Sequence, residues 1–511
     1  MPDIVRAHAR WRPQATALEF EGRSVTFADL DAATDRLAAG LRALGVGSGD
    51  RVAYLGRNSD RFFELMFAAN KLAAVITPLN WRLAPPEIAY ILDDAEPAVT
   101  FVGEACDGLW AQASALARTT TRVLPLGEAT AGDLADLIGQ AAAGFEATQI
   151  DPEQAAILLY TSGTTGRPKG AMLSHRSLVE LRRREAVGPD WLRWQPPEVC
   201  LVSMPLFHIS GIRLGVAALF NGCHVLVIPE FDAARVLTII HTRDVTRLLL
   251  VPAAMQMLAR HPDAARTDFS RIKYVYYGGS PISPALLSEC ISVFGCGFVQ
   301  SYGSTETCGL AAVLGPEDHH PVGGPKMNSV GTGRLGVEIR ITSPDGRILP
   351  AKAFGEVNIR SPGNMSGYWR MPEETAATLS ADGWIRTGDG GLIDEDGYLF
   401  LKDRIKDMII TGGENVYPTE VENVLAAHPS VAEVGVFGVP SERWGEEVRA
   451  AVVLRPGARA SEADLVAWAR ERLAGYKTPK QLRLVDALPR NAGGKILKRE
   501  LRRLHADVTP A

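Results

Sequence analysis

A run of glycines, hydroxyl side chains and one lysine follows a short apolar stretch, within ILLYTSGTTGRPKGAMLSH at residues 157–175. Glycines let a backbone turn tightly and bring its N–H groups close to a ligand. Hydroxyls add hydrogen-bond donors, and a lysine supplies a compact positive charge suited to phosphate oxygens. The run therefore predicts a loop that cradles a polyphosphate, and its members are Thr161, Ser162, Gly163, Thr164, Thr165, Gly166 and Lys169.

The spacing of this loop distinguishes it from the common mononucleotide loop. Its pattern is G-x-x-G-x-x-K-G, whereas the mononucleotide loop has the pattern G-x-x-x-x-G-K-[ST]. For a generic sequence of this composition, a mobile surface turn rich in glycine and threonine is the simpler interpretation. The complete string is far more specific than such a turn, and it favours phosphate binding.

Six further motifs follow the loop in one order along the chain. With them the sequence resembles the adenylate-forming superfamily, which contains acyl-CoA synthetases, aryl-CoA ligases, beetle luciferases and adenylation domains of peptide synthetases. The resemblance covers nearly the whole chain and is greatest to bacterial fatty-acyl- and aryl-acid:CoA ligases. The motifs are PLFHISG at 205–211, GGSP at 278–281, QSYGSTE at 300–306, GWIRTGD at 383–389, DRIKDMIITGGENVYPTEVE at 403–422 and PRNAGGKILK at 489–498.

The resemblance implies a two-step reaction at one site. A carboxylate attacks the α-phosphorus of ATP and expels pyrophosphate, and the thiol of CoA then attacks the acyl adenylate and expels AMP. The first transition state gathers negative charge on phosphoryl oxygens, so cations and fixed N–H donors must face them. Mg²⁺ is the expected cofactor, and ATP, CoA and a small carboxylic acid are the expected substrates.

Three charged residues carry the adenylation step by resemblance. Lys495 bridges the substrate carboxylate and the α-phosphate, although the charged run KILKRELRR could also be a solvated basic helix. Glu306 holds Mg²⁺, a hard cation that prefers oxygen ligands, with Thr161 as a second ligand; either residue could instead be a surface or capping group. Lys169 in the phosphate loop is the third.

A second set of residues resembles the family's nucleotide contacts. Asp389 corresponds to the acid that accepts hydrogen bonds from both ribose hydroxyls, which a carboxylate can do with its two oxygens. Arg404 corresponds to a further ribose contact. An aromatic face can stack on a base. The resemblance places the adenine wall at Gly278, Gly279, Ser280, Ser301 and Tyr302. Thr305, close to that wall in the sequence, is a further expected nucleotide contact.

The acyl and CoA side of the site is expected near His208 and Gly303. Adenylation domains for α-amino acids carry an Asp at the His208 position, so an amino-acid substrate is disfavoured; a packed or capping role is the alternative for this histidine. Gly412 and Gly413 would line the CoA channel after the C-terminal domain rotates. Lys406 stands where the family places the hinge for that rotation.

The elements that position these residues alternate between strands and helices over the first part of the chain. Apolar runs such as RVAYLG at 51–56 and AAILLY at 155–160 predict strands, and residues 26–46 predict an amphipathic helix capped by Thr26. This pattern predicts an α/β body with largely parallel sheets. After about residue 330, Asp-Gly pairs between short strands predict hairpins of a small antiparallel sheet or barrel.

These patterns predict an α/β fold in two domains. A large N-terminal adenylation domain is expected over 1–404, with layered α/β sheets over roughly 1–315 and a β-barrel-like subdomain over 316–404. A small mobile α+β domain is expected over 405–511. A chain of 511 residues exceeds what one hydrophobic core normally serves.

Composition limits the partners. A net charge of −5 lacks the basic footprint of a nucleic-acid-binding protein, so no nucleic acid is expected. Six scattered cysteines without metal-ligand spacing predict reduced, mostly buried thiols in the cytoplasm. No apolar run is long enough to span a membrane, although an apolar substrate could bring weak peripheral membrane contact. The oligomeric state stays open.

Two other functions share these motifs. One is an acyl-AMP ligase that loads a carrier protein instead of CoA; the other is a non-catalytic nucleotide- or acyl-CoA-binding protein. The second is disfavoured because Lys495, Glu306 and Asp389 are all present. The sequence fits either a medium- or long-chain fatty acid or an aryl acid of the hydroxycinnamate type.

Overall fold

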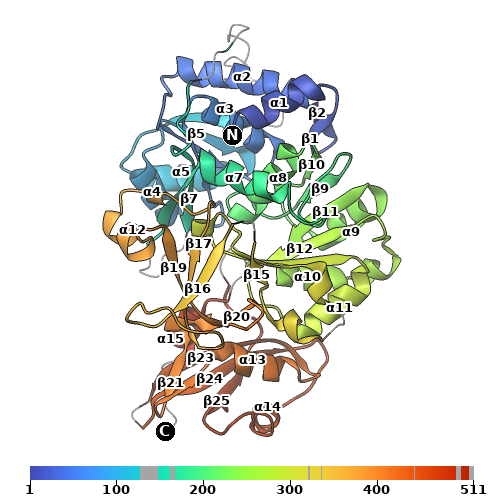
Figure 1. The fold of residues 1–511 in the computed structure, drawn as a ribbon, viewed down its shortest axis with the longest axis vertical. Coiled ribbons are helices and arrows are strands. Elements are labelled where there is room, and N and C mark those ends of the chain that lie inside the picture. Colours follow the sequence, from blue (N-terminus) through green and yellow to red (C-terminus); the bar gives the residue numbers. More distant parts are fainter. Residues whose placement is uncertain are drawn as a thin grey trace.

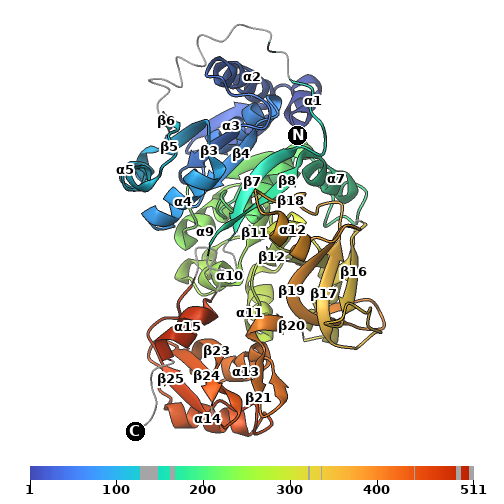
Figure 2. The same cartoon turned by 90° about the vertical axis from the view of Figure 1, so that its left-hand side faces the viewer.

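The computed structural model describes residues 1–126, 145, 148–161, 167–319, 323–334, 336–441, 443–490 and 496–505, without the side chains of Arg404 and Lys406. It shows a large N-terminal α/β domain and a small C-terminal domain, which confirms the predicted fold class (Figures 1 and 2). The C-terminal domain, coloured orange to red, lies at the end of the molecule opposite helices α1 and α2 (Figure 1).

The first large sheet is mostly parallel and has seven strands. Their order is β18-β8-β7-β4-β3-β5-β6, and only β8 and β18 run antiparallel to their neighbours. The strands are β3 (Arg51–Leu55), β4 (Val75–Leu79), β5 (Val99–Gly103), β6 (Arg122–Leu126), β7 (Ala155–Thr161), β8 (Lys169–Ser174) and β18 (Gly367–Tyr368). The strands predicted at 51–56 and 155–160 are therefore confirmed.

The second large sheet has nine strands in the order β15-β14-β13-β12-β11-β9-β10-β1-β2. Its centre is parallel, and antiparallel strands close both edges. The strands are β1 (Thr16–Phe20), β2 (Arg23–Thr26), β9 (Val199–Val202), β10 (His224–Val227), β11 (Val245–Leu250), β12 (Tyr274–Gly278), β13 (Gly297–Tyr302), β14 (Ala312–Leu314) and β15 (Thr332–Gly333).

Helices cover the faces of both sheets. Thr26 caps α2 by accepting a hydrogen bond from the backbone N–H of Asp29, as predicted. Helices α3 and α8 are buried on nearly all sides, and their apolar residues join one core cluster. The helices are α1 (Asp3–Trp11), α2 (Phe27–Ala43), α3 (Asp60–Lys71), α4 (Pro85–Ala95), α5 (Asp107–Leu116), α7 (His175–Glu185), α8 (Ile209–Phe220), α9 (Ala233–Thr242), α10 (Pro252–Ala259) and α11 (Pro284–Phe294).

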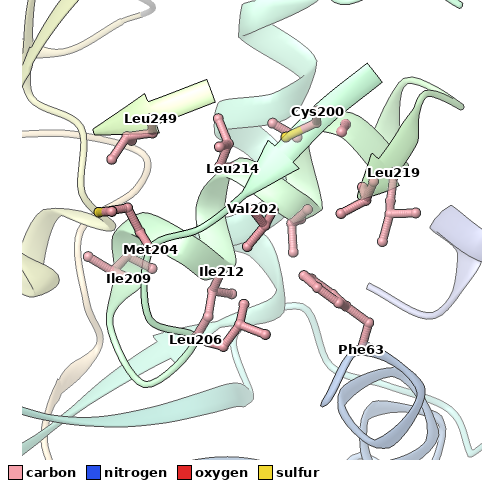
Figure 3. Close-up of a cluster of buried hydrophobic side chains, with 14 of the residues drawn as sticks. Phe63, Cys200, Val202, Met204, Leu206, Ile209, Ile212, Leu214, Leu219 and Leu249 are labelled. Carbon is pink, nitrogen blue, oxygen red and sulfur yellow. The ribbon is translucent and has the colours of Figure 1, made fainter. Parts of the chain in front are cut away.

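Helix α8 is the best-anchored of the elements near the predicted acyl site. Figure 3 shows Ile209, Ile212 and Leu214 among Met204 and Phe63, which come from the segment after β9 and from α3. Burying such side chains stabilises the fold by roughly 1.5–3 kcal/mol each. The start of α8 is therefore held rigidly against the second sheet.

A four-stranded antiparallel sheet follows, in the order β16-β17-β19-β20 (Figure 2). The predicted Asp-Gly turns at 345–346 and 396–397 connect its strands, and the latter closes the hairpin between β19 and β20. The elements are β16 (Glu338–Thr342), β17 (Gly355–Arg360), α12 (Pro372–Thr378), β19 (Trp384–Ile393) and β20 (Leu399–Arg404).

The C-terminal domain has its own five-stranded sheet and its own apolar core. Strands β22, β21, β24 and β23 follow one another, and β25 pairs with β24. The elements are β21 (Ile409–Thr411), β22 (Glu414–Val416), α13 (Pro418–Ala426), β23 (Val431–Ser441), β24 (Gly445–Leu454), α14 (Glu462–Arg470), β25 (Gln481–Leu484) and α15 (Lys498–His505). Short 3₁₀ turns elsewhere span Glu104–Cys106, Pro262–Arg266, Thr305–Thr307, Pro316–His319, Pro325–Asn328 and Ile405–Asp407.

All six cysteines are free thiols, and all but Cys296 are buried. Within the described ranges, no helix combines the length and apolar character that crossing a membrane requires.

Candidate active site

Two neighbouring parallel strands end side by side and bring two predicted adenine segments together. Gly278 at the end of β12 pairs with Ser301 near the end of β13. A Cβ on Gly278 would lie 2.1 Å from the carbonyl oxygen of Ser301, so only glycine permits this approach. Gly279 and Ser280 thus continue from one strand end while Tyr302 closes the other. Ligands of α/β proteins bind outside such carboxyl ends.

The predicted ribose acid reaches the same place from the antiparallel sheet. Asp389 lies on β19 and accepts a hydrogen bond of 2.6 Å from the hydroxyl of Tyr302. The strand register pairs Asp389 with Arg404 of β20, so the backbones of both predicted ribose contacts are adjacent. Residues 87 positions apart in sequence therefore form one polar contact.

Glu306 belongs to a short 3₁₀ turn that follows β13 directly. Its carboxylate accepts a hydrogen bond of 2.8 Å from the hydroxyl of Tyr368, and its carbonyl accepts one from the N–H of Met365. The ring of Tyr368 lies under the Lys169 ammonium, with 5.2 Å from Nζ to the ring centroid. Tyr368 therefore connects the two predicted charged residues.

The sequence carries no local signal for Tyr368. Its strand β18 pairs with β8, which begins at Lys169, and this pairing alone brings the tyrosine beside the phosphate loop. A single tyrosine some 60 residues after Glu306 has no spacing that would identify it as a partner.

The residues predicted to hold Mg²⁺ have suitable chemistry. Glu306 offers a carboxylate that can accept more contacts than the one from Tyr368. Thr161 ends β7, and its hydroxyl lies 3.4 Å from the carbonyl oxygen of Lys169. One carboxylate and one hydroxyl fit a cation that takes oxygen ligands and completes its shell with water and phosphate.

Part of the predicted machinery lies outside the described residues. This applies to Ser162, Gly163, Thr164 and Thr165 of the phosphate loop, and to Lys495. The described ends of the loop, Thr161 and Lys169, face each other in the antiparallel pairing of β7 with β8.

His208 stands at the N-terminus of α8, half-buried beside the ring of Phe207. Its ring centroid lies 4.7 Å from that of Phe207, and its Nε2 is buried without a hydrogen-bond partner. Burial, with a smaller contribution from the Arg82 cation, lowers the pKa of His208 to about 4. The imidazole is therefore neutral at pH 7.

The turn after β13 closes over the start of α8. A Cβ on Gly303 would lie 2.7 Å from the N–H nitrogen of Leu310, so the turn folds tightly on itself. A Cβ on Gly309 would lie 3.3 Å from Cγ2 of Ile209, the residue after His208. The turn of residues 303–310 thus packs against the start of α8, and Ser301 just before it lies 3.4 Å from Arg213 of α8.

The predicted CoA-channel glycines lie within the C-terminal domain. Gly412 and Gly413 form the turn between β21 and β22, and the N–H of Gly412 donates to the carbonyl of Trp444. Among the described residues, the contacts of this turn are with other parts of the C-terminal domain. The structure therefore does not bring these glycines to His208 or Gly303.

Ion pairs surround the predicted hinge residue. Lys406 lies in the 3₁₀ turn Ile405–Asp407, just after β20. From α15, Lys498 lies 3.4 Å from Asp403 and 3.1 Å from Glu422, and Arg502 lies 3.0 Å from Asp407. Burial raises the pKa of Asp403 to about 6, although Lys498 opposes that shift.

Comparison with known proteins identifies the family of this chain. Residues 5–369 match the family described as AMP-binding enzyme, and residues 420–495 match the AMP-binding enzyme C-terminal domain. The chain belongs to the AMP-binding enzyme family.

Relatives and solved structures agree with this family. A fatty acid–[acyl-carrier-protein] ligase, ScoC of Streptomyces coeruleorubidus, is 41% identical over 97% of this chain and 94% of its own length. A feruloyl-CoA synthase of Amycolatopsis sp is 40% identical, over 97% of each chain. The crystal structure of ATP-bound MatB from Rhodopseudomonas palustris matches with a TM-score of 0.89 at 32% identity, covering 99% of each chain.

These findings establish the reaction class. The chain is an AMP-forming acid:CoA ligase, an acid–thiol ligase that uses ATP, Mg²⁺ and CoA.

Proposed function

We propose that this enzyme activates an aryl acid of the hydroxycinnamate type, or a medium- or long-chain fatty acid, and transfers its acyl group to CoA. The observation that carries the proposal is the meeting of Tyr302 with Asp389 at the ends of β12 and β13. A nucleotide there would have an aromatic face for its base and a carboxylate for its ribose. The feruloyl-CoA synthase relative supports the aryl acid.

The adenylation step needs positive charge around the phosphates of ATP. Lys169, Lys495 and the phosphate loop hold the polyphosphate and stabilise the charge that develops on it. Glu306 and Thr161 bind magnesium, which neutralises charge on the phosphate oxygens when it is bound. Tyr368 holds the Glu306 carboxylate through its 2.8 Å hydrogen bond.

The adenine and ribose of ATP bind at the ends of β12 and β13, beside the residues that hold the phosphates. Gly279, Ser280, Ser301 and Thr305 border the adenine, and Tyr302 stacks on it. Asp389 accepts hydrogen bonds from the ribose hydroxyls while Arg404 supports the ribose from the adjacent strand.

The thioester step uses the other face of the turn 303–310. Neutral His208 borders the acyl group and orients it through its unpaired Nε2. Rotation at Lys406 replaces Lys495 by the turn of Gly412 and Gly413, whose backbone then lines the CoA channel. Free cysteine thiols support a cytoplasmic enzyme, and the acidic net charge supports the absence of a nucleic-acid partner. An apolar acid would add weak peripheral membrane contact.

A carrier-protein thiol is the second candidate acceptor. It is favoured by one observation, the 41% identity to a fatty acid–[acyl-carrier-protein] ligase over 97% of this chain. CoA and a carrier protein present the same phosphopantetheine thiol, so the adenylation residues would be unchanged.

The test is a panel of aliphatic and aryl acids, each assayed for AMP release with CoA and with a phosphopantetheinylated carrier protein. The proposal predicts AMP release that requires an acid from these classes and CoA. Acylation of the carrier protein but not of CoA would support the second candidate instead. If no acid supported AMP release, both candidates would be overturned.

A pair of glutamate variants makes this assay specific. Glu306→Gln should lower AMP release about 10²–10³-fold, the scale for losing one preorganised electrostatic contact. Glu317→Gln, in the neighbouring 3₁₀ turn and more than half exposed, should leave it unchanged.

A further inference from the structure

Two arginines and one glutamate are buried together behind the turn 303–310. Arg182 and Glu185 lie on α7, and Arg213 lies on α8, with side-chain exposures of 2%, 3% and 7%. Arg182 Nη1 lies 2.9 Å from Glu185 Oε2, and Arg213 Nη1 lies 3.5 Å from Glu185 Oε1. One carboxylate therefore faces two guanidinium groups, which leaves an excess positive charge in a buried place.

The donors of these arginines are poorly satisfied. A guanidinium carries five N–H donors, yet Nη2 of Arg182 is buried without a hydrogen-bond partner. Arg213 Nη2 reaches the hydroxyl of Ser301 only at 3.4 Å. Burial lowers the pKa of Arg213, with Glu185 opposing that shift. Burying a cation is costly unless it is paired and hydrogen-bonded, so the cluster is incomplete as it stands.

These three side chains line a small cavity. It measures about 10 Å³, which is room for about one water-sized group. Its other walls are mostly apolar or aromatic, including Trp194, Tyr276 and Leu310. A cavity with a cationic end and apolar walls suits one oxygen atom carried on an apolar body.

The cavity adjoins the candidate acyl site. Arg213 lies one helical turn after Ile209 on the same face of α8, and a Cβ on Gly309 would contact both residues at 3.3 to 3.6 Å. Arg213 lies five positions after His208, about 7.5 Å along the helix axis. Ser301, which Arg213 contacts, precedes Tyr302 in the nucleotide site. An acid whose carboxyl lies between His208 and Tyr302 would thus extend toward Arg213.

We infer that Arg213, held by Arg182 and Glu185, binds an oxygen acceptor at the end of the substrate remote from its reacting carboxyl. The acceptor is a phenolic, carbonyl or second carboxylate oxygen. This inference rests on the proposed function and sharpens it: an aryl acid with a distal oxygen is preferred over an acid that ends in hydrocarbon.

Pairs of acids that differ only at the far end test the inference. The pairs are 4-hydroxycinnamate with cinnamate and octanedioate with octanoate, each assayed for CoA-dependent AMP release. A hydrogen bond to a charged donor changes affinity by about tenfold to a hundredfold. Wild-type enzyme should therefore favour the oxygen-ended member of at least one pair by that factor in kcat/KM, mainly through KM.

Arginine variants assign the preference to this cluster. Arg213→Met should bring the kcat/KM ratio of the preferred pair close to one, and Arg182→Met should lower it several-fold. Arg183→Met is the matched control, because that neighbouring arginine is 70% exposed; it should keep the wild-type ratio. The ratio of two substrates on one protein cancels any loss of active enzyme.

Each outcome decides. Equal use of both members of each pair by wild-type enzyme, or an unchanged ratio in Arg213→Met, overturns the inference. Should Arg213→Met fail to fold, the wild-type ratios and Arg182→Met still decide. If hydrocarbon-ended acids were turned over equally well, this inference alone would be overturned. If none of the acids tested supported AMP release, the proposed function would be overturned.

Discussion

At the scale of single residues, the site is made of contacts between side chains that are far apart in sequence. The hydroxyl of Tyr302 donates to Asp389, and the hydroxyl of Tyr368 donates to Glu306. In both cases a neutral phenol donates to a carboxylate for which we propose a ligand-binding role. A hydrogen bond to a charged group contributes about 1.5–3 kcal/mol, so each tyrosine should influence ligand affinity through its acid.

Removing the Tyr302 hydroxyl tests this arrangement. Tyr302→Phe keeps the ring for stacking but leaves Asp389 without this donor, so the KM for ATP should rise about tenfold. The control is Tyr398→Phe, which removes a comparable 2.9 Å hydrogen bond to Asp318 in the β-rich part of the chain. Steady-state kinetics with varied ATP would contradict the assignment if both variants gave the same KM.

The buried imidazole of His208 predicts a pH effect. Its pKa is about 4 in the folded protein and 6.5 as a free side chain, so protonation favours the unfolded chain. The stability that its neutral form contributes is fully present above pH 6.5 and is lost as the pH falls toward 4. Between pH 7 and 5 the loss should be about 2 kcal/mol.

Urea unfolding at those two pH values, followed by tryptophan fluorescence, measures this loss. His208→Gln cannot protonate, so its loss of unfolding free energy should be smaller than that of the wild type by about that amount. Burial also lowers the pKa of His175, to about 3, and the resulting loss of stability is the same in both proteins. Identical losses would show that His208 is not a buried neutral imidazole.

At the scale of elements, the site depends on how closely β12 and β13 approach. Strand β12 spans Tyr274–Gly278, and its last residue lies against Ser301 of β13. The binding face therefore begins where two adjacent strands end together, and a side chain at Gly278 would push them apart.

Gly278→Ala should separate these strand ends. The new Cβ would lie 2.1 Å from the Ser301 carbonyl oxygen, so unfolding free energy should fall by about 1–3 kcal/mol and the KM for ATP should rise. Gly108→Ala is the control, because nothing lies within 4 Å of its Cβ position in α5; it should leave both quantities nearly unchanged. Equal effects of the two substitutions would contradict the close approach.

The sequence predicts elements well because their signals are local. Thr26 marks the cap of α2, and the pair Asp396-Gly397 marks the hairpin between β19 and β20. Motif residues are also found from sequence, since each motif is one contiguous stretch of the chain. Tyr368 and Arg213 are different. Tyr368 reaches the phosphate loop only because β18 pairs with β8, and Arg213 reaches Glu185 only because α7 packs beside α8. No local sequence spacing predicts these tertiary contacts.

At the scale of the whole molecule, the proposed rotation of the C-terminal domain would let one site serve two reactions. The turn of Gly412 lies within the C-terminal domain, while α15 is tied by Lys498 and Arg502 to Asp403 and Asp407 on either side of Lys406. The pair of Lys498 with Asp403 crosses that residue, so it would have to change if the C-terminal domain rotates there.

Lys406→Pro tests the rotation. Proline fixes φ and removes a backbone N–H, so adenylation should persist while thioester formation falls at least tenfold. The measurement is a comparison of single-turnover acyl-adenylate formation with overall production of acyl-CoA. Overall turnover equal to that of the wild type would place the hinge elsewhere.

The central claim is that a carboxylate displaces pyrophosphate from ATP at the ends of β12 and β13 before any thiol takes part. Acid-dependent exchange of labelled pyrophosphate into ATP, measured without CoA, tests it most directly. The account predicts exchange that needs the acid and Mg²⁺, and a loss of about 10²–10³-fold in Lys495→Ala. Exchange that requires CoA, or none with an acid that supports AMP release, would contradict it.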